Sequence, residues 1–152
     1  MLIGLIGLLI LKVNIYLNSY NHIKELDSIF YDGDTNVTKY IGFIEIKRLG
    51  IKRGIVNGIN DIVLNANDIG LIKNDNIILA GHSVENVFGK LHSIKFKDEI
   101  ILYLDNKITK YYVTDIKVVD KKDVDSLNSE LNLITCMYDN NKRLIIGAKK
   151  SI

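Results

Sequence analysis

Short runs of β-branched and aromatic residues, separated by turn residues, are the feature that most limits how this 152-residue chain can fold. Branched and aromatic side chains pack well on a pleated, half-buried surface, so runs of this kind are typical of strands. They are IGFIEIK (41–47), IKRGIVNG (51–58), NIILAGH (76–82), DEIILYLD (98–105), KITKYYVTDIKVVD (107–120), LNLITC (131–136) and KRLIIGAKK (142–150). The sequence therefore predicts a mainly β protein.

The turns between these runs must be made by Asn, Asp and Gly, because the chain has no proline. Asp105-Asn106 and the segment 139–141 each predict a hairpin turn. Helical segments are predicted only at 59–66 and 84–94, and both are short. Repeated crossovers between parallel strands need longer helices, so we expect an antiparallel barrel or sandwich.

The composition is that of one globular domain with a short tail. Hydrophobic residues make up 47% and charged residues 25%, and the net charge is +2, from 20 Lys and Arg against 18 Asp and Glu. No run of Lys and Arg exceeds two residues, so the sequence lacks the basic stripe that neutralises phosphates. We expect no nucleic-acid partner.

Residues 1–17 form an apolar segment that we interpret as a membrane anchor. The run MLIGLIGLLIL is interrupted only at Lys12, whose long side chain can reach the headgroups. A helix of this length spans roughly 25 Å, against a hydrocarbon core of roughly 30 Å. Three alternatives stay open: an anchor that continues upstream of this chain, a short complete anchor, and a cleaved signal peptide or soluble core helix. Cleavage is disfavoured because no A-x-A-like pair of small residues follows the run.

A polar stretch separates this segment from the strands. Residues 18–40 contain YDGDTNVTKY, which has turn residues and no apolar periodicity, so we interpret them as a linker. The predicted domains are the anchor (1–17), the linker (18–40) and a globular domain (41–152).

Cys136 is the only cysteine of the chain. A single cysteine excludes an intrachain disulfide and a structural zinc site built on paired cysteines. Without further context, a lone cysteine is either a small buried hydrophobic residue or a nucleophile.

Three chemically capable residues lie at predicted strand ends: His82, Cys136 and Arg143. Such side chains can converge at one mouth of a barrel, where a rigid scaffold holds them. Together they suit acyl transfer, in which a thiolate attacks a carbonyl, an imidazole moves a proton and a guanidinium binds the developing charge. The alternatives are a buried thiol, a turn histidine and a surface cation.

These elements resemble the sortase family. The resemblance rests on AGH (80–82), VFGKL (87–91), LITC (133–136) and KRLII (142–146), and it extends over about 41–150. It implies a closed eight-stranded antiparallel or mixed barrel with short helices. It also implies catalysis by His82, Cys136 and Arg143 without a cofactor or a metal.

The resemblance also implies the reaction and the partners. Cys136 would attack an LPxTG-like sorting signal and form a thioacyl enzyme, which an amino nucleophile from a cell-wall precursor or pilin would resolve. Thr135, Ile134 and Ala80 are the predicted substrate-binding residues. The partners would be surface proteins that carry the signal, and the anchor would hold the catalytic domain at the outer face of the cell membrane.

Two other functions stay open. The barrel could serve a thiol hydrolase that cuts the signal without transfer, or a catalytically silent, membrane-tethered module that holds extended peptides.

Other polar residues have simpler interpretations. We expect His22 and His92 to be solvated. The acidic residues Asp120, Asp123, Asp125 and Glu130 could suggest calcium, but they lack a recognisable loop motif, which favours a solvated loop.

Overall fold

The structure is a computed structural model that describes residues 40–123, 127–138 and 141–151. The predicted anchor, the linker up to residue 39, His22 and Asp125 lie outside the described residues. Within the described ranges, no helix has the length and apolar character needed to cross a membrane.

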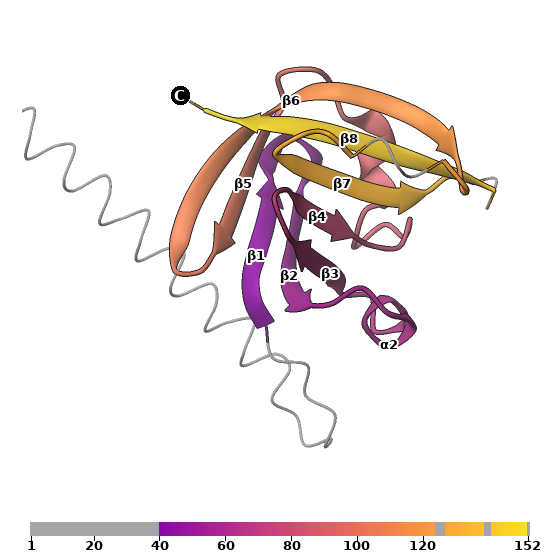
Figure 1. Cartoon of the computed structure of the whole chain (residues 1–152), viewed down its shortest axis with the longest axis horizontal. Helices are drawn as coiled ribbons and strands as arrows, with labels where there is room; N and C mark the ends of the chain where they lie inside the picture. Colours follow the sequence, from indigo (N-terminus) through magenta and orange to yellow (C-terminus); the bar gives the residue numbers. More distant parts are fainter. Residues whose placement is uncertain (1–39, 124–126, 139–140, 152) are drawn as a thin grey trace, which may run out of the picture. The chain divides into compact units, whose positions relative to one another are not determined.

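Eight strands and three short helical segments make up the described part of the chain (Figure 1). The strands are β1 (Tyr40–Ile46), β2 (Ile51–Asn57), β3 (Ile69–Lys73), β4 (Ile77–Ala80), β5 (Glu99–Leu104), β6 (Lys107–Asp120), β7 (Leu131–Cys136) and β8 (Lys142–Lys150). The helical segments are η1 (Lys47–Leu49), α2 (Asp61–Asn65) and η2 (Gly89–Ser93). The strands close into a barrel in the order β1-β2-β3-β4-β7-β8-β6-β5, which confirms the predicted fold class.

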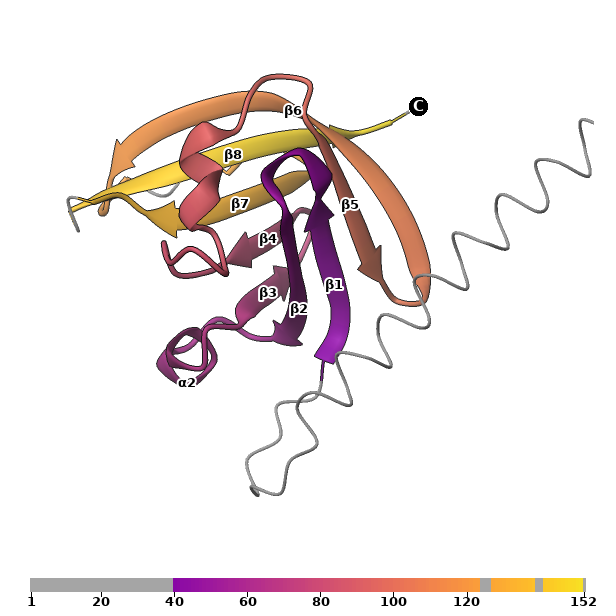
Figure 2. The same ribbon diagram turned by 180° about the vertical axis from the view of Figure 1, so that it is seen from behind.

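The barrel is mixed rather than purely antiparallel. β2 pairs with β3, and β4 pairs with β7, in parallel, while the other neighbouring pairs are antiparallel. A parallel pair needs a connection that returns to the same end of the sheet. The segment that contains α2 makes this return between β2 and β3. Between β4 and β7 the chain passes through η2, β5 and β6, and Figure 2 shows the first part of this path, from β4 through η2 to β5.

The predicted hairpin at Asp105-Asn106 is confirmed. Both residues have positive φ, 54° and 58°, as a two-residue type I′ turn requires. Leu104 pairs with Lys107 directly across this turn. The second predicted hairpin joins β7 to β8, which pair antiparallel, although residues 139–140 of its turn are not described.

β3 was not predicted, and both predicted helices are shorter than expected. Ile69, Gly70 and Leu71 are all buried, so this strand lacks the alternation that identifies a half-buried one. The segment predicted as a helix at 84–94 is a turn followed by η2. Gly89 explains part of this, because its Cα lies so close to Val84 that a Cβ would meet the Val84 carbonyl carbon at 2.7 Å.

The first described residue ties β1 to the entry of β3. The Tyr40 hydroxyl donates a 2.6 Å hydrogen bond to the carboxylate of Asp68, which is buried. The Tyr40 ring covers Gly54, where a Cβ would lie 2.3 Å from the ring. Burial, and then the bond to Asp68, raise the pKa of Tyr40 well above its ordinary value.

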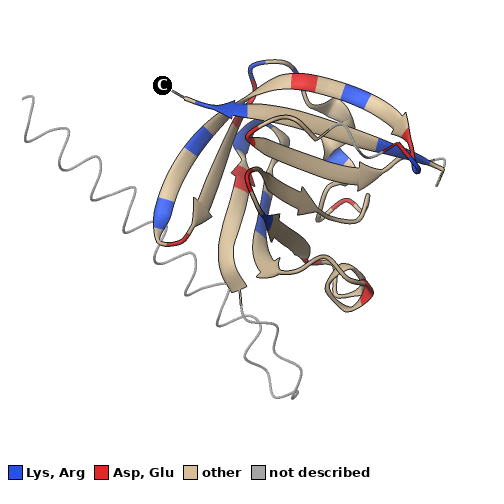
Figure 3. Cartoon of the chain, viewed as in Figure 1, with Lys and Arg blue, Asp and Glu red and all other residues tan. Residues whose placement is uncertain are grey.

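Charges of both signs are interspersed over the strands, as the small net charge suggests (Figure 3). Ion pairs join Lys110 to Glu99 at 3.1 Å and Lys117 to Asp115 at 3.3 Å. These exposed pairs add little stability, because solvent screens them.

Candidate active site

The three predicted catalytic residues lie at the same end of three neighbouring strands, β4, β7 and β8. Cys136 is the last residue of β7, and Arg143 is its register partner in β8. β4 runs parallel to β7 with Ala80 beside Ile134, so His82, two residues further on, follows β4 at the level of Cys136.

Cys136 and Arg143 face each other across an antiparallel pair. The next pair is hydrogen-bonded, since Met137 N donates to Lys142 O at 3.1 Å. Hydrogen-bonded and non-hydrogen-bonded pairs alternate, so Cys136 and Arg143 form a non-hydrogen-bonded pair, the kind with the closer side chains, at about 4.5 Å between Cα atoms. Both side chains are half-buried, and Arg143 Nη1 also donates to Lys142 O at 3.0 Å.

These residues lie on the outer face of the barrel. Leu79 and Leu133 are fully buried members of the core, whereas Ala80, Ile134 and Cys136, which alternate with them, are half-buried and outside the core cluster. Successive side chains of a strand point to opposite faces, so these three share the outer face.

Ile145 belongs to the same face, and sequence reasoning did not single it out. It lies directly opposite Ile134, and opposed residues of an antiparallel pair share a face. It is buried without belonging to the core cluster. The two-residue spacing of Arg143 and Ile145 in KRLII could have indicated that both lie on the same face of the strand. Together with Ala80 and Ile134, Ile145 forms an apolar strip across β4, β7 and β8.

A brace between β7 and the end of β4 fixes the position of His82. Gly81 N donates to Ile134 O at 3.2 Å, which extends the parallel ladder one residue beyond β4. The buried Thr135 hydroxyl donates to Gly81 O at 2.9 Å. Gly81 has no room for a side chain, because a Cβ would lie 2.8 Å from Val87 Cγ1. Thr135 therefore supports the site from the inner face, and its contact with substrate stays a prediction.

The segment after His82 folds back on itself. The His82 carbonyl accepts a 3.0 Å hydrogen bond from Phe88 N, and Val84 O accepts from Gly89 N at 2.8 Å. Val87 and Phe88 are fully buried. A compact turn, anchored by the buried Val87 and Phe88, thus holds His82 at the end of β4.

We expected His92 to be solvated, but the structure shows that it is partly buried and has two side-chain partners. It is half-buried, its Nε2 lies 3.0 Å from Ser83 Oγ, and its ring stacks on Tyr138 with centroids 5.0 Å apart and planes 21° apart. No local signal in the sequence links these residues, because they come from three separate segments that only the closed barrel brings together.

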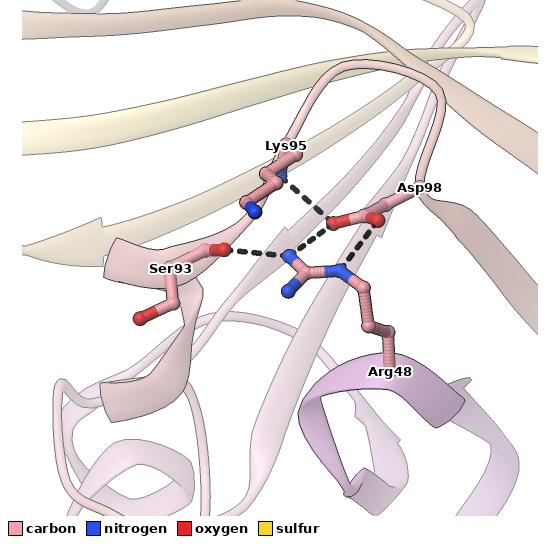
Figure 4. A network of polar contacts seen from close by, with 4 residues as sticks. All are labelled: Arg48, Ser93, Lys95 and Asp98. Atoms are coloured by element: carbon pink, nitrogen blue, oxygen red, sulfur yellow. Dashed lines mark hydrogen bonds and ion pairs between the residues drawn. The ribbon is translucent and has the colours of Figure 1, made fainter.

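An ion-pair network holds the backbone beside His92 (Figure 4). Arg48 donates to both carboxylate oxygens of Asp98, at 2.6 and 2.5 Å, and to Ser93 O at 2.6 Å. Lys95 N donates to Asp98 at 2.8 Å. The hydrogen bond from Arg48 is the main cause that lowers the pKa of Asp98. The network joins η1, the end of η2 and the start of β5.

Among the described residues, no three His, Cys, Asp or Glu side chains gather into a group that could hold a metal ion. Of the acidic residues discussed above, Glu130 accepts a 2.6 Å hydrogen bond from Lys150 N.

Comparisons with known proteins agree with this architecture. The sortase domain model matches residues 44–151. No curated protein matches the chain. A lid mutant of sortase A from Corynebacterium diphtheriae is 24% identical, with a TM-score of 0.67 over 75% of this chain and 71% of that one.

Sortases of other classes are similar in fold. Streptococcus pneumoniae sortase C is 20% identical, with a TM-score of 0.68 over 80% of this chain and 74% of that chain. Sortase E1 from Streptomyces coelicolor is 20% identical, with a TM-score of 0.67 over 76% of this chain and 90% of that chain. At these identities the structures show the fold alone, but the family model covers well over half of the sequence. The chain therefore belongs to the sortase family, whose members are cysteine transpeptidases.

Proposed function

We propose that this protein is a sortase transpeptidase that cleaves an LPxTG-like sorting signal and transfers the protein to an amino nucleophile. The observation that carries the proposal is the pairing of Cys136 with Arg143, next to the braced Gly81-His82 segment. A thiol, an imidazole and a guanidinium at the same end of neighbouring strands supply a nucleophile, a proton carrier and an anion-binding group.

In the acylation step, the Cys136 thiolate attacks the carbonyl carbon of the threonine in the signal. Arg143 stabilises the negative charge that develops on the carbonyl oxygen. The intermediate collapses as the C–N bond breaks, and His82 gives a proton to the departing amine. A thioester on Cys136 remains.

In the second step, an amine attacks the thioester. His82 takes the proton that the amine loses, the new amide forms, and the C–S bond breaks to regenerate the thiolate. If water attacks instead, the same intermediate gives a free acid, which is the hydrolase alternative.

The apolar strip suits an extended peptide. Ala80 and Ile134, which are half-buried, lie on the outer face of strands that end at or near the catalytic residues, and the buried Ile145 lies opposite Ile134. Apolar side chains of the sorting signal would be removed from water there, while Cys136 meets the scissile carbonyl.

The partners and the location follow from the same proposal. The substrates are surface proteins that carry the sorting signal, and the second substrate is a cell-wall precursor or a pilin amine. Residues 1–17 anchor the chain in the cell membrane, with the catalytic domain on the extracellular face.

The test is product analysis with the full chain in detergent. A library of LPxTG-like peptides is incubated with and without an amino nucleophile, and mass spectrometry follows the products and the thioester on Cys136. We expect transfer products and an adduct that Cys136→Ala and alkylated wild-type protein both lack. The same products from wild type and Cys136→Ala would refute the proposal, and free acid alone in the presence of amine would identify a hydrolase.

A further inference from the structure

Tyr138 presents an unusually bare aromatic ring close to the nucleophile. It lies two residues after Cys136, and it is 89% exposed. Met137 between them packs against the core, so Cys136 and Tyr138 both point away from it. A large ring that stays in water at this position has apolar surface available for a ligand.

His92 stacks against this ring and leaves most of it exposed. The two rings stack at 5.0 Å between centroids, with planes 21° apart. His92 is in turn held at its edge by Ser83, 3.0 Å from Nε2, and Ser83 directly follows His82. His92 thus bridges the segment after the predicted catalytic histidine and the segment after the predicted nucleophile.

The backbone around His92 is itself fixed. Leu91 is fully buried, and the Ser93 carbonyl accepts a 2.6 Å hydrogen bond from Arg48, which Asp98 clamps in place (Figure 4). Because the residues before and after His92 are fixed, His92 can support the exposed ring of Tyr138.

We propose that His92 is a positioning residue that holds the Tyr138 ring as a contact surface for the bound peptide beside Cys136. The proposal rests on the proposed function, because it concerns the peptide substrate of the same site. A ring held in its binding orientation before the peptide arrives loses less conformational freedom on binding. His92 therefore acts on peptide binding through Tyr138 and not on the thiol.

The test is a double-mutant cycle in peptide turnover with the full chain. Tyr138→Ala removes the contact surface and is expected to raise KM about fivefold, the size of one aromatic contact, with kcat within about twofold. His92→Ala is expected to raise KM to a similar extent. The double variant is expected to match the single ones, because both changes remove the same interaction.

Conservative variants and a matched control separate positioning from a structural role. Tyr138→Phe and His92→Phe keep the stacked rings and are expected to restore a near wild-type KM. Tyr112→Ala removes another exposed tyrosine, whose partner Lys149 lies near the far end of β8, and is expected to leave KM unchanged. The rate of Cys136 alkylation is expected to stay within about twofold of wild type in every variant.

Several outcomes would overturn the inference. An unchanged KM in Tyr138→Ala would do so, as would effects of His92→Ala and Tyr138→Ala that multiply in the double variant. If His92→Ala does not fold, then His92→Leu, which fills similar space without a stacking ring, decides the question together with Tyr138→Ala: a wild-type KM in His92→Leu would overturn the inference. A wild-type protein that turns over no peptide would instead refute the proposed function, and this inference with it.

Discussion

Thr135→Val removes the brace between β7 and the end of β4 at nearly constant side-chain size. The Thr135 hydroxyl is buried and donates a 2.9 Å hydrogen bond to Gly81 O. The substitution leaves this carbonyl without that bond, and an unpaired buried polar group costs about 1–3 kcal/mol. We expect the free energy of unfolding to fall by about 2 kcal/mol.

Urea unfolding measures this change. For a domain of this size the denaturant slope is about 1–3 kcal/mol per molar urea, so the midpoint is expected to fall by about 1 M. Thr135→Ser is the matched control, because it keeps the hydroxyl and loses one methyl group, which costs about 1 kcal/mol. The Val variant should therefore be the less stable of the two.

The same substitution is expected to affect catalysis, because Gly81 directly precedes His82. A looser His82 segment should lower kcat about tenfold in Thr135→Val, since small displacements of a catalytic group are costly, while Thr135→Ser stays close to wild type. If Thr135→Val were as stable as wild type, or more stable than Thr135→Ser, the bracing role of the hydroxyl would be refuted.

Four further predictions concern packing, catalysis and, in two cases, pH. Gly81→Ala places a Cβ 2.8 Å from the buried Val87, so we expect a loss of about 1–3 kcal/mol in urea unfolding. Arg143→Lys keeps the charge but loses the planar guanidinium, so kcat should fall at least about tenfold while Cys136 alkylation is unchanged. The raised pKa of Tyr40 means that the unfolded chain ionises first, so stability is full below about pH 10 and falls as pH rises above it. The lowered pKa of Asp98 means that the stability it contributes is present above about pH 4 and is lost as pH falls below that, because a protonated carboxyl group no longer pairs with Arg48.

Each of these has a control and a contrary outcome. Tyr40→Phe should flatten the alkaline fall in stability, and Asp98→Asn should flatten part of the acid fall; unchanged slopes would contradict the two assignments. Wild-type kcat in Arg143→Lys would show that charge alone suffices. Wild-type stability in Gly81→Ala would show that the buried side chains move aside freely.

Several features of the fold could be predicted because their causes are local. Asp105-Asn106 predicts a tight hairpin turn, since both residues adopt positive φ more readily than most, and the turn sets the pairing of β5 with β6. β7 and β8 were predicted from their branched residues. The ends of these strands then suggested where Cys136 and Arg143 lie.

Other features depend on contacts between distant segments. β3 is buried along Ile69–Leu71 and pairs in parallel with β2, and neither property leaves a periodic pattern in five residues. The helix expected at 84–94 gives way to a tight turn, because buried Val87 and Phe88 and the close approach of Gly89 to Val84 outweigh local helical preference.

The sequence by itself determined the β-rich class, the hairpin turns and the candidate residues His82, Cys136 and Arg143, because composition and strand ends are local properties. Only the tertiary structure decided that Cys136 is paired with Arg143, that Thr135 braces Gly81, and that His92 lies between Ser83 and Tyr138. The physical reason is closure of the barrel, which sets the register between strands and brings together side chains that no short-range pattern relates.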